Sequence, residues 1–187
     1  MRARRLEVPF YTDRRLPGVL KDDVMNKLFL LLLTVGNSLA WIPAAQAQSA
    51  PTQIYSAASG PGKCLGIREG DLSHPFMAKC AGYPAENWTA SARNGNGFVK
   101  FQSQRTGPGM CLGVAAANTA TVKMASCASV KNQQWMLTPT GQPNTFTVTS
   151  QLLGPGMCLG IAPNTDDTEL NMNTCHGYPG QVWTISL

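Results

Sequence analysis

The hydrophobic and polar positions of this chain repeat with a fixed period. The block Gly60–Ile67, with the sequence Gly-Pro-Gly-Lys-Cys-Leu-Gly-Ile, returns at Gly107–Val114 and at Gly154–Ile161, at intervals of 47 residues. In each copy a second cysteine follows 16 or 17 residues after the first, and a tryptophan follows eight residues later. A pattern that recurs in order three times predicts three copies of one structural unit. We expect these copies at about residues 52–91, 98–138 and 145–187.

Each copy is predicted to form four short β-strands. The first strand is clearest at Phe98–Ser103 and Phe146–Ser150. The Gly-Pro-Gly sequence that follows predicts a type II turn, in which the second glycine is left-handed. The second strand carries Cys-Leu-Gly, the third leads to the second cysteine, and the fourth holds the tryptophan. On the first strand of each copy, one equivalent apolar residue is expected to face the interior: Ile54, Phe101 and Val148. On the third strand, an equivalent methionine is expected to lie near an axis shared by the copies: Met77, Met124 and Met172.

Twelve short strands in three equal copies favour an all-β fold with pseudo-threefold symmetry. One copy is too small to bury its own apolar face, so the three copies must pack against one another. Closing the strands into a barrel also removes the exposed edges that short strands would otherwise leave. We therefore predict a closed barrel capped by hairpins.

The N-terminal part of the chain has the pattern of an export signal. A short basic start at Met25-Asn-Lys27 precedes the apolar run Leu28–Val35, and Ala45-Gln46-Ala47 fits a signal-peptidase site. The apolar run is shorter than the roughly 20 residues that span a bilayer. We interpret residues 25–47 as a signal peptide and 48–187 as the mature domain, without a membrane span. Residues 1–24 are interpreted as an upstream extension from a mis-called start, and a long but genuine signal start is the alternative.

Composition changes once the predicted signal is set aside. The whole chain has 15 Lys and Arg against 10 Asp and Glu, but residues 48–187 have eight against six. No strong positive field remains that would favour nucleic acid as a partner. Leu, Ile, Val and Phe make up only 23 of these 140 residues, which is below the roughly 20 % typical of a well-filled core.

All six cysteines lie in the predicted mature domain. An even number of cysteines in a small exported domain is typical of a disulfide framework, and the predicted location is secreted or periplasmic. Six cysteines allow 15 pairings, and the matched spacings favour one bridge inside each copy. The expected bridges are Cys64–Cys80, Cys111–Cys127 and Cys158–Cys175.

The repeated Gly-x-x-Cys-Leu-Gly block, the second cysteine and the Gln-x-Trp sequence resemble the ricin B-type β-trefoil lectins. The resemblance covers the predicted mature domain. It implies a β-trefoil in which each tryptophan packs in the core and each glutamine bonds to backbone. Gln133–Trp135 and Gln181–Trp183 match this element, whereas Glu86 stands in place of glutamine before Trp88. An ionised Glu86 can only accept hydrogen bonds, so repeat one is expected to be looser there.

The resemblance also implies binding of galactose-like sugars in shallow pockets. Members of the family that bind galactose typically place an aspartate directly after Cys-Leu, where this chain has Gly66, Gly113 and Gly160. They tend to place an aromatic residue two positions before the second cysteine and an amide four positions before it. Only repeat three keeps that amide, at Asn171. The sequence thus preserves the scaffold better than the usual sugar site.

Repeat three has the richest set of candidate sugar ligands. Carboxylates and amides can bind sugar hydroxyls, although a solvated turn is the favoured interpretation of this loop. If a sugar binds, we predict the main site here, with weak affinity. The candidates are Asp166, Asp167, Asn171 and Asn173, with Glu69, Asp71 and His74 in the equivalent loop of repeat one. Tyr83 and Tyr178 follow the second cysteines of these two repeats, where a ring can stack on a glycan or pack over the disulfide. The second role is favoured.

Neither catalysis nor metal binding is indicated. No free cysteine is expected, no histidine accompanies a nucleophile, and neither histidine has a ligand-like spacing. The predicted function is an exported, non-enzymatic, cofactor-free domain that binds glycans. The alternative is a trefoil that no longer binds sugar and acts as an interaction or delivery subunit for a separate secreted toxin or enzyme chain, similar to the ricin-like subunits of cytolethal distending toxin. A protease inhibitor is a third possibility, although such trefoils lack the Gln-x-Trp repeat.

Overall fold

The computed structural model describes residues 50–115, 118–161 and 168–187 of the chain. The predicted signal peptide at 25–47, the upstream segment 1–24, and the candidates Asp166 and Asp167 lie outside the described residues.

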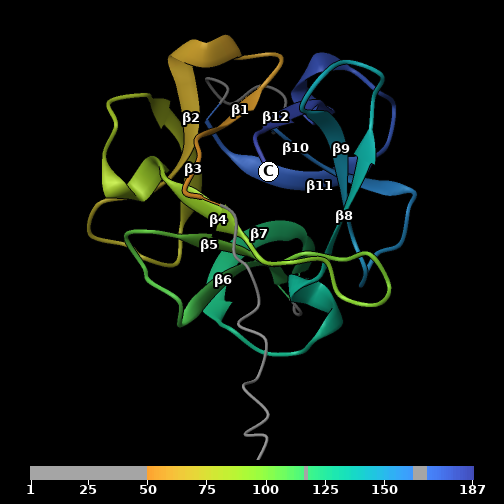
Figure 1. Cartoon of the computed structure of the whole chain (residues 1–187), viewed down its shortest axis with the longest axis horizontal. Coiled ribbons are helices and arrows are strands. Elements are labelled where there is room, and N and C mark those ends of the chain that lie inside the picture. The colour runs from red at the N-terminus through yellow and green to blue at the C-terminus, as the bar shows by residue number, and fades with distance from the viewer. Residues whose placement is uncertain (1–49, 116–117, 162–167) are drawn as a thin grey trace, which may run out of the picture. The chain divides into compact units, whose positions relative to one another are not determined.

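Twelve β-strands occur in the described residues, in three successive groups of four (Figure 1). The first group is β1 (Ile54–Ser56), β2 (Lys63–Ile67), β3 (Pro75–Lys79) and β4 (Trp88–Ala90). The second is β5 (Phe101–Ser103), β6 (Met110–Ala115), β7 (Asn118–Ser126) and β8 (Trp135–Pro139). The third is β9 (Thr145–Ser150), β10 (Met157–Ile161), β11 (Leu170–Thr174) and β12 (Trp183–Ile185). A short 3-10 helix precedes the last strand of each group: η2 (Pro84–Glu86), η3 (Lys131–Gln133) and η4 (Pro179–Gln181).

The first and last strands of the three groups close into a ring. Antiparallel pairing joins β1 to β12, β12 to β9, β9 to β8, and β4 to β5. Two isolated bridges complete the circuit, because Thr52 pairs with Trp88 and Val99 pairs with Trp135. The predicted closed barrel is therefore present, and its strands have their backbone partners within the ring.

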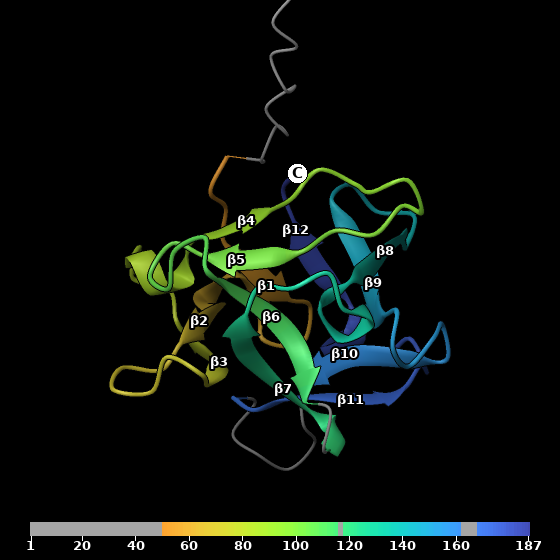
Figure 2. The ribbon, with the colours of Figure 1, turned by 90° about the horizontal axis from the view of Figure 1, so that it is seen from below.

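The second and third strands of each group form antiparallel hairpins that cap the barrel (Figure 2). The hairpins contact one another through the Met77 amide, which donates to the Thr168 carbonyl, and the Met124 amide, which donates to the Ser73 carbonyl. Asn171 of β11 pairs with Thr121 of β7. The three methionines predicted to share an axis are all buried on strands that contact each other: Met77, Met124 and Met172. The copies thus depend on one another, as expected from the small apolar face of each.

The tryptophans fix each barrel strand to its hairpin. Trp88, Trp135 and Trp183 are completely buried. Each indole N–H donates to the backbone carbonyl of the leucine in the Cys-Leu-Gly block, at 2.7, 2.9 and 2.9 Å. The amphipathic ring is therefore buried with its polar group satisfied. The predicted inward residues Ile54, Phe101 and Val148 are also buried, and they join the tryptophans in one core.

The Gly-Pro-Gly turns differ from the predicted type II geometry. The left-handed residue is the first glycine of each turn, with φ of 63°, 70° and 77° at Gly60, Gly107 and Gly154. In the second and third copies the amide of this glycine donates to a serine carbonyl four residues earlier, at 3.0 and 2.9 Å. That bond closes the preceding bend and places the left-handed residue before the proline. The prediction of positive φ at the second glycine was wrong.

The three disulfides join the cysteines of each repeat as predicted. They are Cys64–Cys80, Cys111–Cys127 and Cys158–Cys175, with Cα–Cα distances of 5.2, 4.9 and 5.0 Å. No described helix is long and apolar enough to cross a membrane.

Candidate functional site

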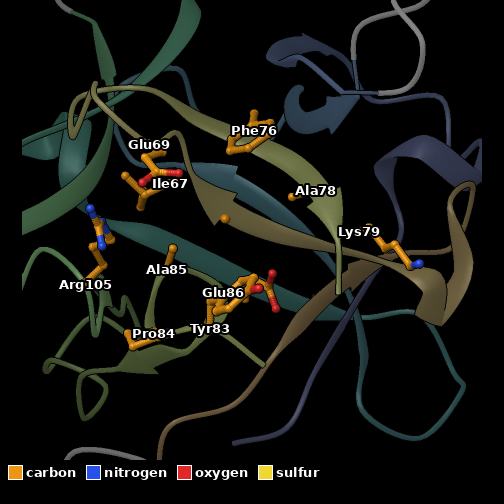
Figure 3. A pocket seen from close by; sticks show the side chains of 11 residues that line it. Ile67, Glu69, Phe76, Ala78, Lys79, Tyr83, Pro84, Ala85, Glu86 and Arg105 are labelled. Carbon is orange, nitrogen blue, oxygen red and sulfur yellow. The ribbon is translucent and has the colours of Figure 1, made fainter. Parts of the chain in front are cut away.

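A pocket of about 490 Å³ opens on repeat one, between the β2–β3 hairpin and η2 (Figure 3). Phe76 and Tyr83 contribute aromatic rings to its lining, and Ala78 and Ala85 contribute small side chains. Figure 3 shows Glu69 and Arg105 toward one end of the pocket and Lys79 toward the other. The pocket therefore combines apolar surface with charges of both signs.

The pocket is open because η2 lies farther from its glycine than η3 and η4 do. A Cβ atom placed on Gly66 would be 3.7 Å from the Glu86 side chain and 3.8 Å from the Ala85 carbonyl. On Gly113 the same atom would approach the Asn132 carbonyl to 3.0 Å, and on Gly160 it would approach Gln181 Cγ to 3.2 Å. All three glycines are buried, but only Gly66 has room for a side chain.

Glu86 makes repeat one different at a second position. Its Oε2 atom accepts hydrogen bonds from the amides of Ala81 and Gly82, both at 2.8 Å. Gln133 accepts one such bond from Ala128, and its Nε2 also donates to the Ser126 carbonyl at 2.8 Å.

Gln181 repeats that bridge in the third copy. It accepts from His176 and Gly177 and donates to the Thr174 carbonyl at 2.8 Å. A carboxylate has no proton for the equivalent bond, whose acceptor in repeat one would be the Lys79 carbonyl. As expected from the sequence, η2 thus lacks one of the bonds by which the glutamines hold η3 and η4.

We expect Glu86→Gln to stabilise the domain by about 1 kcal/mol, because the amide can restore one backbone hydrogen bond and removes a buried charge. Thermal unfolding followed by circular dichroism measures this as a higher Tm. Gln133→Glu is the matched control, and it should lower Tm because repeat two loses the corresponding donor. Equal Tm values for all three proteins would show that the missing bond has no energetic weight.

The two equivalent tyrosines have different surroundings. Tyr83 is 65 % exposed beside the pocket, whereas Tyr178 is 36 % exposed. Ring atoms of Tyr178 lie 3.5 Å from the position of a Cβ on Gly180, and the ring stacks on His176 with centroids 6.3 Å apart. Tyr178 thus packs over its own loop, while Tyr83 leaves a ring accessible to a ligand.

Asp71 and His74, predicted as sugar ligands, are held by contacts within the protein. Asp71 Oδ1 accepts from the amide and hydroxyl of Ser73, at 3.0 and 2.7 Å. The Ser73 hydroxyl and amide lower the pKa of this exposed carboxyl. His74 Nε2 lies 3.0 Å from Glu169 Oε2, and Arg68 pairs with the other oxygen of Glu169 at 3.0 Å. The two contacts of Glu169 join repeats one and three, and neither Asp71 nor His74 lines the pocket.

In repeat three the structure describes only part of the predicted site. Asn173 Nδ2 donates to Asn171 Oδ1 at 2.9 Å, and both side chains are partly buried. Asp166 and Asp167 lie outside the described residues. The prediction of a sugar site in this loop therefore stays a prediction. Among the described residues, no group of three or more potential ligands could hold a metal ion.

Arg105 and Lys79 belong to the pocket and were not identified from the sequence. Arg105 follows β5 in repeat two, and its amide donates to the Pro84 carbonyl of η2 at 3.1 Å. This contact carries a residue of the second copy to the pocket of the first. The repeat pattern aligns equivalent residues but gives no signal for such a contact between copies.

Comparison with known proteins places this geometry in a family. Residues 50–183 match the model of the ricin-type β-trefoil lectin domain. No curated protein matches the chain.

Solved structures share the fold at low sequence identity. The designed threefold-symmetric protein ThreeFoil is 20 % identical, with a TM-score of 0.62 over 74 % of this chain and 100 % of its own. The ricin B-like lectin of Macrolepiota procera, solved in complex with lactose, is 14 % identical, with a TM-score of 0.57 over 76 % of this chain and 99 % of its own. A mosquitocidal holotoxin is 18 % identical, with a TM-score of 0.63 over 75 % of this chain but only 16 % of its own.

These likenesses confirm the β-trefoil implied by the resemblance to ricin B-type lectins. The matched region covers β1 to β11, the start of β12, the three disulfides and the three buried tryptophans. The chain belongs to the family of ricin-type β-trefoil lectin domains.

Proposed function

We propose that this domain is an exported, non-catalytic module that binds carbohydrate in the pocket of repeat one. The observation that carries the proposal is the open pocket over Gly66, which has an exposed tyrosine at its edge and charged groups in its lining. The family supports this function, and the Macrolepiota procera lectin was solved with lactose.

The lining matches the chemistry of a sugar. The Tyr83 and Phe76 rings can cover the apolar face of a pyranose, while Glu69 can accept from hydroxyl groups and Arg105 can donate to them. Within the described residues, neither Arg105 nor Lys79 forms an ion pair, so ligand hydroxyls need not displace a protein partner. Because the pocket is open to solvent, we expect binding in the millimolar range, about −4 kcal/mol.

Titration of galactose, lactose and N-acetylgalactosamine by NMR tests the site. Tyr83→Ala should weaken binding about tenfold, since it removes the accessible ring. Tyr178→Ala is the matched control in the equivalent turn, and it should leave affinity within twofold. Loss of binding in Tyr178→Ala but not in Tyr83→Ala would contradict the proposed site.

The same titration distinguishes the pocket of repeat one from the sugar site predicted in repeat three. An Asp167→Ala, Asn171→Ala variant removes two of the four candidates of repeat three. If the pocket of repeat one is the site, this variant binds like the wild type. If it alone loses binding, the sugar occupies repeat three.

A second candidate function is an interaction subunit of a secreted toxin or enzyme. Gly66, Gly113 and Gly160 replace the aspartates of galactose-binding members, and the similar structures include a mosquitocidal holotoxin and cytolethal distending toxin. A broad glycan array separates the two functions. Absence of any glycan signal would reject the lectin proposal and favour a protein partner.

Export gives a separate expectation. The mature protein should begin at Gln48 or within a few residues of it, because Ala45-Gln46-Ala47 fits a cleavage site, and the three disulfides suit an oxidising compartment. N-terminal sequencing of the exported protein measures this. An N-terminus at Met1 or Met25 would contradict cleavage.

A further inference from the structure

A second cleft, of about 420 Å³, lies beside the segment that joins repeats one and two, and it shares no lining residue with the pocket over Gly66. One wall is the segment 91–100, which joins β4 to β5, and the other wall lies around the start of β8. Figures 1 and 2 both show this lime-green segment reaching toward β8. Two cations, four carboxamides, two serines and a half-buried aromatic ring line the cleft. They are Arg93, Lys100, Asn94, Asn96, Gln134, Gln151, Ser91, Ser129 and Phe98.

Hydrogen bonds fix the walls of this cleft. Val99 and Trp135 exchange two backbone hydrogen bonds, both at 2.9 Å. Asn94 Oδ1 accepts from the backbone amides of Asn96 and Phe98, at 3.0 and 2.9 Å, and Asn94 Nδ2 donates to Gln134 Oε1 at 3.2 Å. The segment is therefore already ordered around the cleft, which lowers the entropic cost of binding a ligand.

The cleft lies in a part of the chain that has no acidic residues. Residues 87–165 contain no Asp or Glu. Five basic residues occur there: Arg93, Lys100, Arg105, Lys123 and Lys131. The residues that line the cleft include two of these cations and no carboxylate. The local potential is thus positive, although the predicted mature domain is close to neutral.

The threefold repeat does not require these side chains. Forty-seven residues further along the chain, the positions of Arg93, Phe98 and Lys100 are occupied by Thr140, Thr145 and Thr147. The backbone bridge is kept in the third copy, where Phe146 pairs with Trp183. The same scaffold therefore forms with neutral residues, and the cations and the ring are specific to the second copy.

We propose that this cleft binds an acidic saccharide, whose carboxylate or sulfate group lies between Arg93 and Lys100. Charge-assisted hydrogen bonds from these side chains would hold the anion. The Phe98 ring can cover the apolar face of the sugar, and the amides and serine hydroxyls can bind its hydroxyl groups. The site is separate from the pocket over Gly66 and does not depend on neutral sugars binding there.

The experiment is a calorimetric and NMR titration of the disulfide-bonded domain with three monosaccharides. Glucuronic acid carries a carboxylate, galactose 6-sulfate carries a sulfate, and galactose is neutral. At least one acidic sugar should bind at this cleft, shift the backbone amides of Phe98, Gln134 and Gln151, and weaken as salt rises from 20 to 200 mM. The acid that binds more tightly identifies carboxylate or sulfate as the preferred group.

Two double variants, each of which removes two positive charges, distinguish a specific anion site from general electrostatic attraction. Arg93→Gln, Lys100→Gln should weaken binding of the acidic sugar at least tenfold. Lys123→Gln, Lys131→Gln removes two charges from the same acid-free stretch, outside the lining of both pockets, and should leave affinity within twofold. Because Arg93 also donates to the Gly97 carbonyl at 3.0 Å, Lys100→Gln alone is measured as a variant that keeps this bond, and it should weaken binding about fivefold.

Three results would overturn the proposal. They are no binding of either acidic sugar at millimolar concentration, equal weakening by the two double variants, or binding of inorganic sulfate as tight as that of the sugars. Failure of galactose, lactose and N-acetylgalactosamine to bind the pocket over Gly66 would count against the proposed site in repeat one and leave this result unaffected.

Discussion

Reducing the three disulfides is expected to unfold the domain at 37 °C. Each bridge closes a loop between cysteines 16 or 17 residues apart, and such a loop contributes about 3 kcal/mol in the chain-entropy model. Three bridges together are comparable to the 5–15 kcal/mol by which typical domains are stable. Only 23 of the 140 residues in 48–187 are Leu, Ile, Val or Phe, so the core has little additional stability to compensate.

Circular dichroism with and without a phosphine reductant measures this effect. The double variants Cys64→Ala, Cys80→Ala and Cys111→Ala, Cys127→Ala remove one bridge each, and each should lower Tm by roughly 10 °C. Because the first cysteine of each pair is almost completely buried and the second is partly exposed, alanine leaves only a small void at the core end. A reduced domain that melts at the same temperature as the oxidised one would show that packing alone is sufficient.

The sequence predicted those parts of the fold that depend on local spacing. The repeat period placed the cysteines, the tryptophans and the inward Ile54, Phe101 and Val148 correctly, since each recurs in a fixed position relative to its own strands. The Gly-Pro-Gly turns were not predicted correctly, because the left-handed residue is the first glycine of each turn. In the second and third copies its amide bonds to the preceding strand, a contact that the Gly-Pro-Gly sequence does not signal.

The candidate site was harder to predict because it depends on distances between segments. Gly66, Gly113 and Gly160 are identical in sequence, yet the gap between each glycine and the following 3-10 helix differs by several tenths of an ångström. Arg105 reaches the pocket from another repeat. Glu86 was a signal in the sequence that repeat one departs from the symmetric pattern, and it lies in the lining of the pocket.

The different distance between each glycine and its 3-10 helix predicts different stability costs for the same substitution. Gly113→Asp is expected to destabilise the domain by about 3 kcal/mol or more, because it combines overpacking with a buried charge. Its Cβ would lie 3.0 Å from both the Asn132 carbonyl oxygen and Gln133 Cγ, so η3 would have to move. The carboxylate would then face a carbonyl oxygen, which cannot donate a hydrogen bond to it.

Gly66→Asp is the matched control at the equivalent position of repeat one. Its Cβ would meet no atom closer than Glu86 Cγ at 3.7 Å, and its carboxylate can extend into the solvent-open pocket, whose lining includes the like-charged Glu86. We expect a cost of about 1 kcal/mol from that repulsion. The alanine pair Gly66→Ala and Gly113→Ala isolates the steric part, and only Gly113→Ala should lower Tm. Urea unfolding of the four variants measures these free energies, and equal costs at the two positions would mean that repeat one is no more open than repeat two.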